Sequence, residues 1–282
     1  MLPAVRILAR GDEGYPARLL DLGDPPARVH LLGTWDADAP AVAVVGTRDA
    51  TAYGERVTRE LVRALGRAGV GVVSGMARGI DAAAHRAALE AGSPTLAVVG
   101  TGVDVPYPVG HRTLHEELAE RGGVLSEQPA GRRAFPGCFP RRNRLIAALA
   151  DVTLIVEAGV KSGALITAGH ALELGRTVAA VPGPIDAPQH RGANELLRDG
   201  AHVVASPDDL LALVGRSVPV PAAPALDGDE RAVWDALGAR ALDLDALTML
   251  SALPAQRCMA AVTTLELRGV IECALTGEVR RR

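Results

Sequence analysis

The chain has 282 residues, a formal net charge of -3, 48% apolar residues and only 2% aromatic residues. This length suits one large domain or a main domain with a small appendage. The scarcity of aromatic rings indicates a core of Ala, Val and Leu. The slightly acidic balance excludes a protein coated in positive potential, so a polyanion would have to bind at a local site.

The sequence shows no sign of export or membrane insertion. The first 14 residues lack the apolar core of a signal peptide, and no apolar run approaches the ~18 residues that span a bilayer. The cysteines Cys138, Cys258 and Cys273 show no CxxC or Cys/His spacing, so we interpret them as free thiols and expect no metal site. We predict a cytoplasmic protein that does not bind membranes.

Short aliphatic runs recur from residue 41 onward, each followed by a stretch compatible with a helix. The runs cover 41–46, 70–75, 95–100, 123–127, 152–157, 177–183 and 202–206. Their continuous apolar character is typical of strands covered on both faces. The alternation predicts an α/β fold with a doubly wound, mostly parallel sheet, in which ligands bind at the carboxyl ends of the strands.

Two shorter regions flank this sheet. Residues 1–40 read as a lead-in with proline-marked turns rather than an independent domain, so the large domain is expected over residues 41–214. Residues 215–227 form a Pro- and Ala-rich linker. Residues 228–282 contain helical patterns followed by a β-compatible end, which predicts a small winged-helix domain.

The loop after the first run, GTRDATAYG, combines a glycine with a following helix. Gly46 lets the backbone approach an anion, and the helix N-terminus favours negative charge there. Arg48 would then close on a phosphate. The alternative is an ordinary strand–helix turn with a solvated arginine.

The loop after the second run begins SGMARGIDAAAH. The residues that suit a tight, positively charged anion-binding turn are Ser74, Gly75, Arg78 and Gly79. We expect Asp81 to cap the helix that follows. We interpret His85, on the first turns of that helix, as a packing or capping residue rather than a catalyst.

The stretch GRRAFPGCFPRRNR, which ends at Arg144, holds both phenylalanines of the chain, five arginines and no acidic residue. Arginines bind phosphates, and an aromatic ring offers a face on which a base stacks. Arg142, Asn143 and Arg144 are expected to begin a helix and so to place donors at its N-terminus. The alternative is that Phe135 and Phe139 fill the core and the arginines form a solvated loop.

A further loop contains the only lysine of the chain. Lys161, Ser162 and Gly163 are expected to open a helix after a strand, which is again an anion-binding arrangement. By contrast, GTGVDVPYPVGH offers only a weak match to GxGxxG, and the chain has no GxxxxGK[ST] P-loop. The strand-end carboxylates Glu127 and Glu157 have no histidine or nucleophile partner that the sequence reveals, so we expect no catalytic group and no cofactor.

The ordered motifs VAVVGTRDATAYG, VVSGMARGIDAAAHRAAL, AVVGTGVDVPYP, GGVLSEQPAG, FPRRNRLIAALA, IVEAGVKSGALITAGHALELGR, VPGPID and GANELLRDGA resemble those of the DNA-processing protein A family (DprA, also called Smf). The resemblance covers roughly residues 41 to 205. The last ~55 residues resemble the winged-helix module of many members. The N-terminus differs, because 40 residues are too few for the helical sterile-alpha-motif-like domain that many members have there.

The resemblance implies an extended Rossmann-like domain and a cytoplasmic, non-enzymatic protein that binds single-stranded DNA. It further implies protection of incoming single strands in natural transformation (competence), loading of the RecA recombinase for DNA recombination, and a homodimer. Phe139 would stack on a base, whereas Phe135 matches no family position. The residues predicted to bind nucleic acid are Gly46, Arg48, Ser74, Gly75, Arg78, Gly79, Phe139, Arg141, Arg142, Asn143, Arg144, Lys161, Ser162 and Gly163.

Two alternatives belong to other functional classes. A nucleotide phosphoribohydrolase of the LOG type shares the sheet plan, but its PGGxGTxxE motif supplies a carboxylate where this chain reads EAGVKSGALITAG. A duplex-binding regulator would use the winged helix, but the candidate helix LPAQRCMAAVTTLELRG carries only Arg257 and Arg268 as cations. A protein-docking or dimer-regulating role suits this module better.

Overall fold

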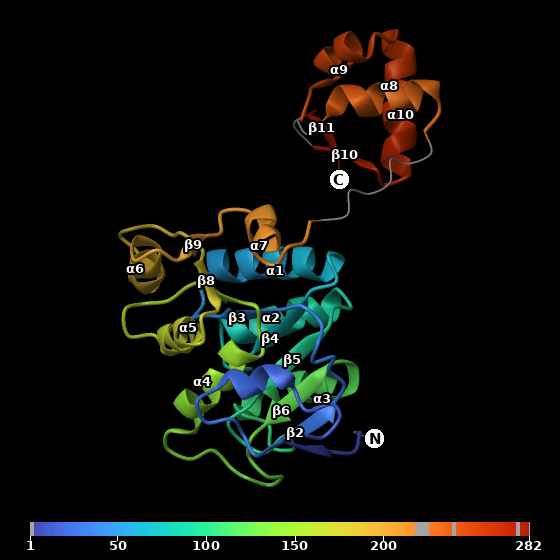
Figure 1. The fold of residues 1–282 in the computed structure, drawn as a ribbon. Helices are drawn as coiled ribbons and strands as arrows, with labels where there is room; N and C mark the ends of the chain where they lie inside the picture. The colour runs from blue at the N-terminus through green and yellow to red at the C-terminus, as the bar shows by residue number, and fades with distance from the viewer. Residues whose placement is uncertain (1–2, 218–225, 239–240, 275–276, 282) are drawn as a thin grey trace. The chain divides into compact units, whose positions relative to one another are not determined.

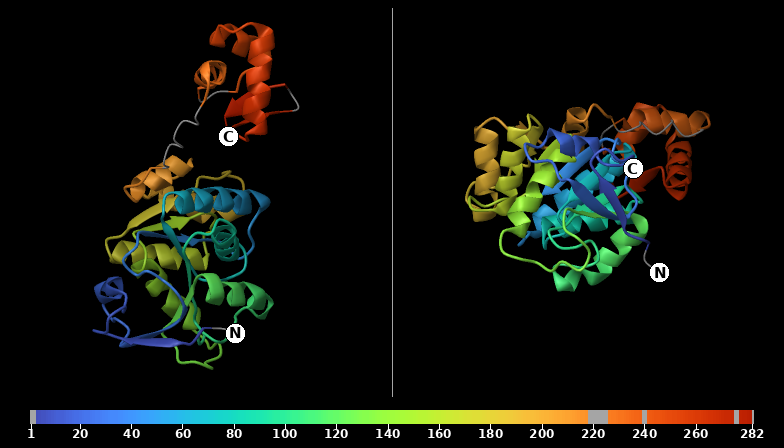
Figure 2. Two further views of the ribbon diagram at one scale, coloured as in Figure 1. Left: turned by 90° about the vertical axis from the view of Figure 1, so that its right-hand side faces the viewer. Right: turned by 60° about the horizontal axis from the view of Figure 1, so that its bottom comes forward.

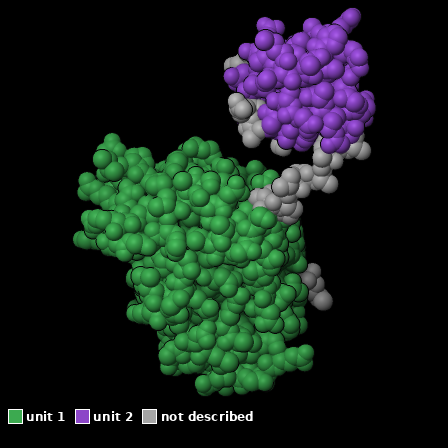
Figure 3. All heavy atoms as spheres, turned by 45° about the horizontal axis from the view of Figure 1, so that its top comes forward, with its two compact units in different colours: residues 1–219 green, residues 220–282 purple. Residues whose placement is uncertain are grey.

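The structure of the protein is a computed structural model, and it describes residues 3–217, 226–238, 241–274 and 277–281 (Figure 1). The chain forms two compact units, Met1–Pro219 and Val220–Arg282 (Figure 3). The larger unit holds an α/β sheet, and the smaller one holds three helices and a β-hairpin in its described residues.

Within the described residues, the larger unit contains one nine-stranded sheet with the order β1-β2-β6-β5-β4-β3-β7-β8-β9. Neighbouring strands from β6 to β9 are parallel, whereas β2 pairs antiparallel with both β1 and β6. Each predicted aliphatic run contains one of the strands β3 to β9, so the mostly parallel sheet is confirmed. The strands are β1 (Arg6–Ala9), β2 (Arg28–Gly33), β3 (Ala41–Val45), β4 (Gly71–Ser74), β5 (Thr95–Val98), β6 (Gly123–Ser126), β7 (Val152–Ile155), β8 (Thr177–Ala180) and β9 (His202–Val203).

Helices cover both faces of the sheet (Figure 2). Because side chains alternate along a strand, β3 feeds two cores: Ala41, Ala43 and Val45 belong to one, and Val42 and Val44 to the other. The first core contacts α4 (Cys138–Ala148), α5 (Gly163–Glu173) and α6 (Arg191–Arg198). The opposite face is covered by α1 (Ala52–Arg67), α2 (Ile80–Glu90), α3 (Arg112–Arg121) and α7 (Pro207–Leu213).

The N-terminal segment is part of this sheet. The sequence predicted only a lead-in with turns, but the structure forms β1, β2 and the short 3-10 helix η1 (Ala17–Asp21) there. Val29 and Leu31 of β2 are buried, and the Tyr15 hydroxyl donates to the Pro26 carbonyl at 2.8 Å. The segment between the two strands is rich in Gly, Pro and Asp, so the local sequence pattern indicates turns rather than strands.

The order of the strands in the sheet reverses between β3 and β7, which makes this position a topological switch point. After β3 the strands β4, β5 and β6 add on one side, and β7 then returns to pair with the other side of β3. At such a switch point the loops that leave neighbouring strands turn to opposite faces and open a crevice. The β3–α1 and β7–α5 loops, with Arg48 and Lys161, lie at this point.

The smaller unit has a core of its own. Its helices α8 (Gly228–Leu237), α9 (Leu244–Ser251) and α10 (Ala255–Leu267) pack through buried Val233, Leu247 and Leu265. The strands β10 (Ile271–Cys273) and β11 (Val279–Arg281) form an antiparallel hairpin. The predicted winged-helix class is confirmed, and the arginine-poor helix is the third helix of the unit.

Two further expectations from the sequence concern the linker and membrane insertion. Residues 218–225 of the predicted linker lie outside the described residues. Among the helices that the structure does describe, none is both long enough and apolar enough to cross a bilayer.

Candidate functional site

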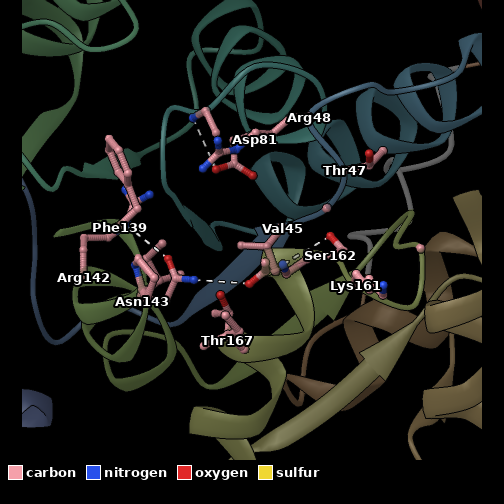
Figure 4. A pocket seen from close by; sticks show the side chains of 18 residues that line it. Val45, Thr47, Arg48, Asp81, Phe139, Arg142, Asn143, Lys161, Ser162 and Thr167 are labelled. Atoms are coloured by element: carbon pink, nitrogen blue, oxygen red, sulfur yellow. Dashed lines mark hydrogen bonds between the residues drawn. The ribbon is translucent and has the colours of Figure 1, made fainter. Parts of the chain in front are cut away.

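A cavity of about 500 Å³ opens at the switch point between β3 and β7 (Figure 4). Its walls come from the β3–α1 loop, the start of α2, the first two turns of α4 and the β7–α5 loop. The polar and aromatic residues that line it include Thr47, Arg48, Asp81, Phe139, Arg142, Asn143, Lys161, Ser162 and Thr167. The cavity is therefore assembled from segments that are far apart in the sequence.

The structure brings together eight of the fourteen residues that the sequence predicts to bind nucleic acid. Those that line the cavity are Gly46, Arg48, Phe139, Arg142, Asn143, Lys161, Ser162 and Gly163. The other six lie outside its lining and are Ser74, Gly75, Arg78, Gly79, Arg141 and Arg144. The contacts of these six explain the difference.

The β3–α1 loop needs glycine for close packing. A Cβ at Gly46 would come within 2.6 Å of Ile80 and 2.9 Å of the Glu157 carbonyl oxygen. The Thr47 amide donates to that same carbonyl at 2.7 Å. The loop is thus fixed against β7, and the exposed Arg48 extends from it with its guanidinium carbon 5.8 Å from the centre of the Phe139 ring.

The loop after β4 supports its neighbours rather than forming an anion-binding turn. The buried Ser74 hydroxyl donates to the Val44 carbonyl at 2.6 Å. Gly79 has φ +75, and a Cβ there would lie 2.2 Å from the Thr47 carbonyl oxygen. Glycine is therefore required at position 79, because the β3–α1 loop lies too close there to leave room for a side chain. Gly75 is buried and Arg78 is exposed.

Asp81 does not cap α2 as predicted. It lies inside the first turn, and its Oδ2 accepts from the Gly75 amide at 3.1 Å and the Ala77 amide at 3.3 Å. The cap position belongs to Gly79, which has no side chain to offer. Burial raises the pKa of Asp81, and the Arg142 charge opposes that rise. The cavity consequently contains one carboxylate among its cations.

Helix α4 begins four residues earlier than the sequence indicated. It starts at Cys138, after Gly137 in the left-handed conformation at φ 82, so Phe139 lies in the first turn and Arg142 in the second. The Phe139 ring is half-buried and packs against Tyr107 with ring centres 4.9 Å apart and planes tilted by 30°. Phe139 therefore does not fill the core.

Arg142 is buried, with a relative exposure of 7%. Its Nη1 donates to the Gly75 carbonyl at 2.8 Å and to the Val98 carbonyl. Burial lowers the pKa of Arg142 to about 10, and Asp81 partly offsets that effect. The Arg142 side chain forms the floor of the cavity and bonds to carbonyls at the ends of β4 and β5. These bonds already use most of its N–H groups.

Glu127 forms ion pairs with two further arginines from the same stretch. Arg144 Nη2 donates to both Glu127 oxygens at 2.8 Å, and Arg141 reaches Oε1 at 3.3 Å. Arg144 also donates to the Asp24 carbonyl at 2.9 Å, which ties α4 to the N-terminal segment. Two of the five arginines in this stretch thus share one carboxylate, whereas Arg132 and Arg133 are exposed.

The β7–α5 loop opens a helix, as the sequence predicted. Ser162 is the N-cap of α5 and accepts from the Ala164 amide, and the helix begins at Gly163. Asn143 Nδ2 donates to the Gly163 carbonyl at 3.2 Å and joins α4 to this loop. Lys161 is exposed. Among the described residues, neither Lys161 nor Arg48 has an ion-pair partner.

Glu157 has partners that the sequence did not reveal. His190 Nε2 lies 3.3 Å from its Oε1, and the Thr51 amide and hydroxyl both donate to the carboxylate. Glu157 and His190 are almost fully buried and do not line the cavity. The cluster fastens the start of α1 to β7 behind the cavity wall.

His85 is the packing residue that the sequence indicated. It is fully buried, and its Nδ1 hydrogen-bonds with Thr95 Oγ1 at 2.8 Å. Burial lowers the pKa of His85 to about 3, with a further contribution from the Arg142 charge. It is therefore neutral at physiological pH and has no contact with the cavity.

The cavity thus combines the N-terminus of α5, an aromatic ring and two cations that form no ion pair with any described residue. Cations and helix N-termini bind anions, and a ring binds a planar group by stacking. Within the described residues, no group of three or more His, Cys, Asp or Glu side chains is arranged to hold a metal ion. The site therefore suits a ligand that contains both phosphate and a flat base.

The fold and the cavity define a parallel α/β protein with a switch-point anion site and an added winged-helix unit. The chain belongs to the DNA recombination-mediator protein A family, whose sequence model matches residues 6–215. A second model, the DprA winged helix domain, matches residues 217–274. The family predicted from the motifs is confirmed.

Relatives and solved structures agree with this assignment. The chain is 43% identical over 272 residues to the putative DNA processing protein DprA of Mycobacterium tuberculosis, covering 92% of this chain and 70% of that protein. The DprA structure from Streptococcus pneumoniae matches with a TM-score of 0.71 and 38% identity over 73% of both chains. The structure of DprA from Helicobacter pylori, which concerns its single-stranded DNA binding mode, matches with a TM-score of 0.67 and 31% identity over 74% of this chain and 94% of that chain.

Proposed function

We propose that this protein binds single-stranded DNA, with a base and its flanking phosphates in the cavity between β3 and β7. The observation that carries the proposal is that the half-buried Phe139 ring and the exposed cations Arg48 and Lys161 line one cavity. The family relationship and the single-stranded DNA binding mode of the Helicobacter pylori protein support it.

Each part of the site has a role in this proposal. Phe139 stacks on a base, and Arg48 and Lys161 neutralise phosphates on either side of it. The N-terminus of α5 adds positive potential that favours a phosphate oxygen. Arg142 positions the floor rather than contacting the strand, whereas Asn143 joins the two walls. The protein acts by binding and not by catalysis.

The winged-helix unit is proposed to dock a protein rather than to read duplex DNA. Arg257 of α10 pairs with Asp229 of α8, and Arg268, directly after α10, pairs with Glu230 of α8. The exposed side of α10 instead presents Met259 and Leu267, which are 54% and 85% exposed. A helix that reads the major groove presents free cations and polar groups.

The finer biological role follows from family membership. We propose that the protein works in the cytoplasm, protects incoming single strands during natural transformation, and helps to load RecA on them. We also propose a homodimer formed by the larger unit, where Leu172, Ile185 and Val203 are exposed apolar side chains. Sedimentation equilibrium and RecA filament assays on coated single strands test these two proposals.

A titration tests the binding function directly. A labelled oligothymidylate and a duplex of equal length are titrated with the protein and followed by fluorescence anisotropy across a range of salt concentrations. The proposal predicts tighter binding to the single strand and a negative slope of log affinity against log salt. Equal binding to both forms, or no binding at low salt, would contradict it.

The nucleotide hydrolase alternative rests on one observation. Asp81 places a carboxylate in the cavity, and burial raises its pKa. However, its Oδ2 is held by two loop amides and the chain lacks the glutamate of the hydrolase motif. Release of free base from nucleoside monophosphates, abolished in Asp81→Asn, would favour hydrolysis over strand binding.

A further inference from the structure

Tyr107, in the loop between β5 and α3, forms an aromatic pair with Phe139 at the edge of the cavity. The two ring centres lie 4.9 Å apart with a tilt of 30° between the planes. Tyr107 is 41% exposed, and it lies outside the lining of the cavity. The pair therefore extends the aromatic surface from the cavity rim toward solvent.

Hydrogen bonds hold the loop that carries Tyr107, both before and after this residue in the sequence. The Thr101 hydroxyl donates to the Val105 carbonyl at 2.8 Å, and the Asp104 carboxylate accepts from the Gly131 amide at 2.8 Å. After the tyrosine, His111 Nδ1 donates to the Met76 carbonyl at 3.1 Å. The backbone that carries Tyr107 is thus fixed before any ligand arrives, which lowers the cost of ordering it on binding.

The Tyr107 hydroxyl differs from the hydroxyls of the other two tyrosines. A buried tyrosine normally uses its hydroxyl in a hydrogen bond, as Tyr15 and Tyr53 do with the Pro26 and Pro182 carbonyls. Within the described residues, the Tyr107 hydroxyl has no such partner. Exposed aromatic pairs are also unexpected in a chain with only three Tyr, two Phe and two Trp.

We infer that Tyr107 is a second base-stacking element, and that it takes a nucleobase of the same strand outside the cavity. The inference rests on the proposed binding of single-stranded DNA by the cavity. Phe139 receives the base that enters the cavity, and Tyr107 presents the solvent side of the aromatic pair to another base. Stacking tolerates any base because every base has a flat face, so this element adds affinity without sequence preference.

The variants Tyr107→Ala and Tyr107→Leu, with Tyr107→Phe as the matched control, test the inference in the full chain. A length series of labelled oligothymidylates is titrated at several salt concentrations. We expect Tyr107→Ala and Tyr107→Leu to bind long oligomers about 5- to 100-fold more weakly. Tyr107→Phe should bind like the wild type. The salt slope should not change, because stacking releases no counterions.

Two further comparisons separate stacking from a change in the fold. Oligomers short enough to occupy only the cavity should bind equally to wild type and Tyr107→Ala, whereas Phe139→Ala should weaken binding at every length. On an abasic strand of the same length, the advantage of wild type over Tyr107→Ala should disappear. Thermal unfolding of the variants should shift only slightly, because Tyr107 is 41% exposed and its aromatic partner is Phe139.

Several outcomes would overturn the inference. They are unchanged binding of long oligomers by Tyr107→Ala, a Tyr107→Phe variant as weak as Tyr107→Ala, or an equal loss on the abasic strand. Failure of the wild type to bind any single strand would instead overturn the proposed function itself.

Discussion

The cations around the cavity fall into two groups that the fold treats in opposite ways. Arg48 and Lys161 are exposed and have no ion-pair partner among the described residues. Arg142 and Arg144 belong to the most basic stretch of the sequence, yet one is buried against carbonyls and the other is paired with Glu127. The local density of arginine thus does not measure the charge available to a ligand.

Substitutions in the two groups of cations should therefore change different measured properties. Loss of a free cation should change ligand binding and its salt dependence without changing stability. Loss of an engaged cation should change stability first. The predictions below test this separation, beginning with the largest effect.

Arg142→Ala should be the most damaging substitution. It leaves Asp81 without the stronger of its two opposing charges, and the Gly75 and Val98 carbonyls without their donor. Removing one member of such a buried set costs about 3–5 kcal/mol of unfolding free energy. Urea unfolding followed by circular dichroism measures this loss. Native stability with weakened DNA binding would place Arg142 among the free cations instead.

Phe139→Ala should weaken single-strand binding by about 5- to 150-fold, which corresponds to the 1–3 kcal/mol of one base stack. The salt slope should stay the same because no phosphate contact is lost. Anisotropy titrations at several salt concentrations measure both quantities. Phe139→Leu serves as a control for volume. Normal binding by Phe139→Ala would mean that the ring only packs against Tyr107.

Arg48→Ala and Lys161→Ala should each reduce the salt slope by about 0.7, the value for one phosphate contact to a single strand. Arg144→Gln is the matched control, since its charge is already taken by Glu127. The same titrations compare the three variants with wild type. A slope change as large in Arg144→Gln as in Arg48→Ala would remove the distinction between the two groups.

The smallest predicted effect concerns pH. Burial raises the pKa of Asp81, so this carboxylate takes up a proton at a higher pH than an ordinary aspartate. As the pH falls through that pKa, the cavity loses a negative charge, so phosphate binding should strengthen. The stability contribution has the same direction, because a raised carboxyl pKa makes the folded state less stable as the pH rises through it.

Asp81→Asn keeps an oxygen for the Gly75 and Ala77 amides and removes the titration. Its affinity at neutral pH should equal or exceed that of wild type, and the strengthening at lower pH should be absent. Titrations at constant ionic strength and varied pH measure this. An identical pH profile in wild type and Asp81→Asn would assign the effect to another group.

The sheet could be predicted from the sequence because each of its parallel strands is a continuous aliphatic run between a glycine-containing turn and a helix. The N-terminal strands could not, because β2 pairs with β6, 90 residues or more away in the chain, and β1 joins the sheet through β2. Local signals were also sufficient for Ser162, whose hydroxyl precedes the helix that it caps.

The site was predictable only as far as the loops that contribute to it. Residue types indicated that Arg48, Phe139 and Lys161 would meet at the strand ends. Which arginines are free depends on partners from other segments, such as Glu127 for Arg144 and the Val98 carbonyl for Arg142. Tyr107 was missed for the same reason, since only the fold brings its ring to Phe139.

Photocrosslinking tests most directly whether the strand lies in this cavity. An oligonucleotide that carries iododeoxyuridine is irradiated in complex with the protein, and the linked residue is identified by mass spectrometry. The account predicts crosslinks at Phe139 and Tyr107 that Phe139→Ala and Tyr107→Ala respectively abolish. Crosslinks confined to the winged-helix unit, or to a face of the larger unit away from β3 and β7, would contradict it.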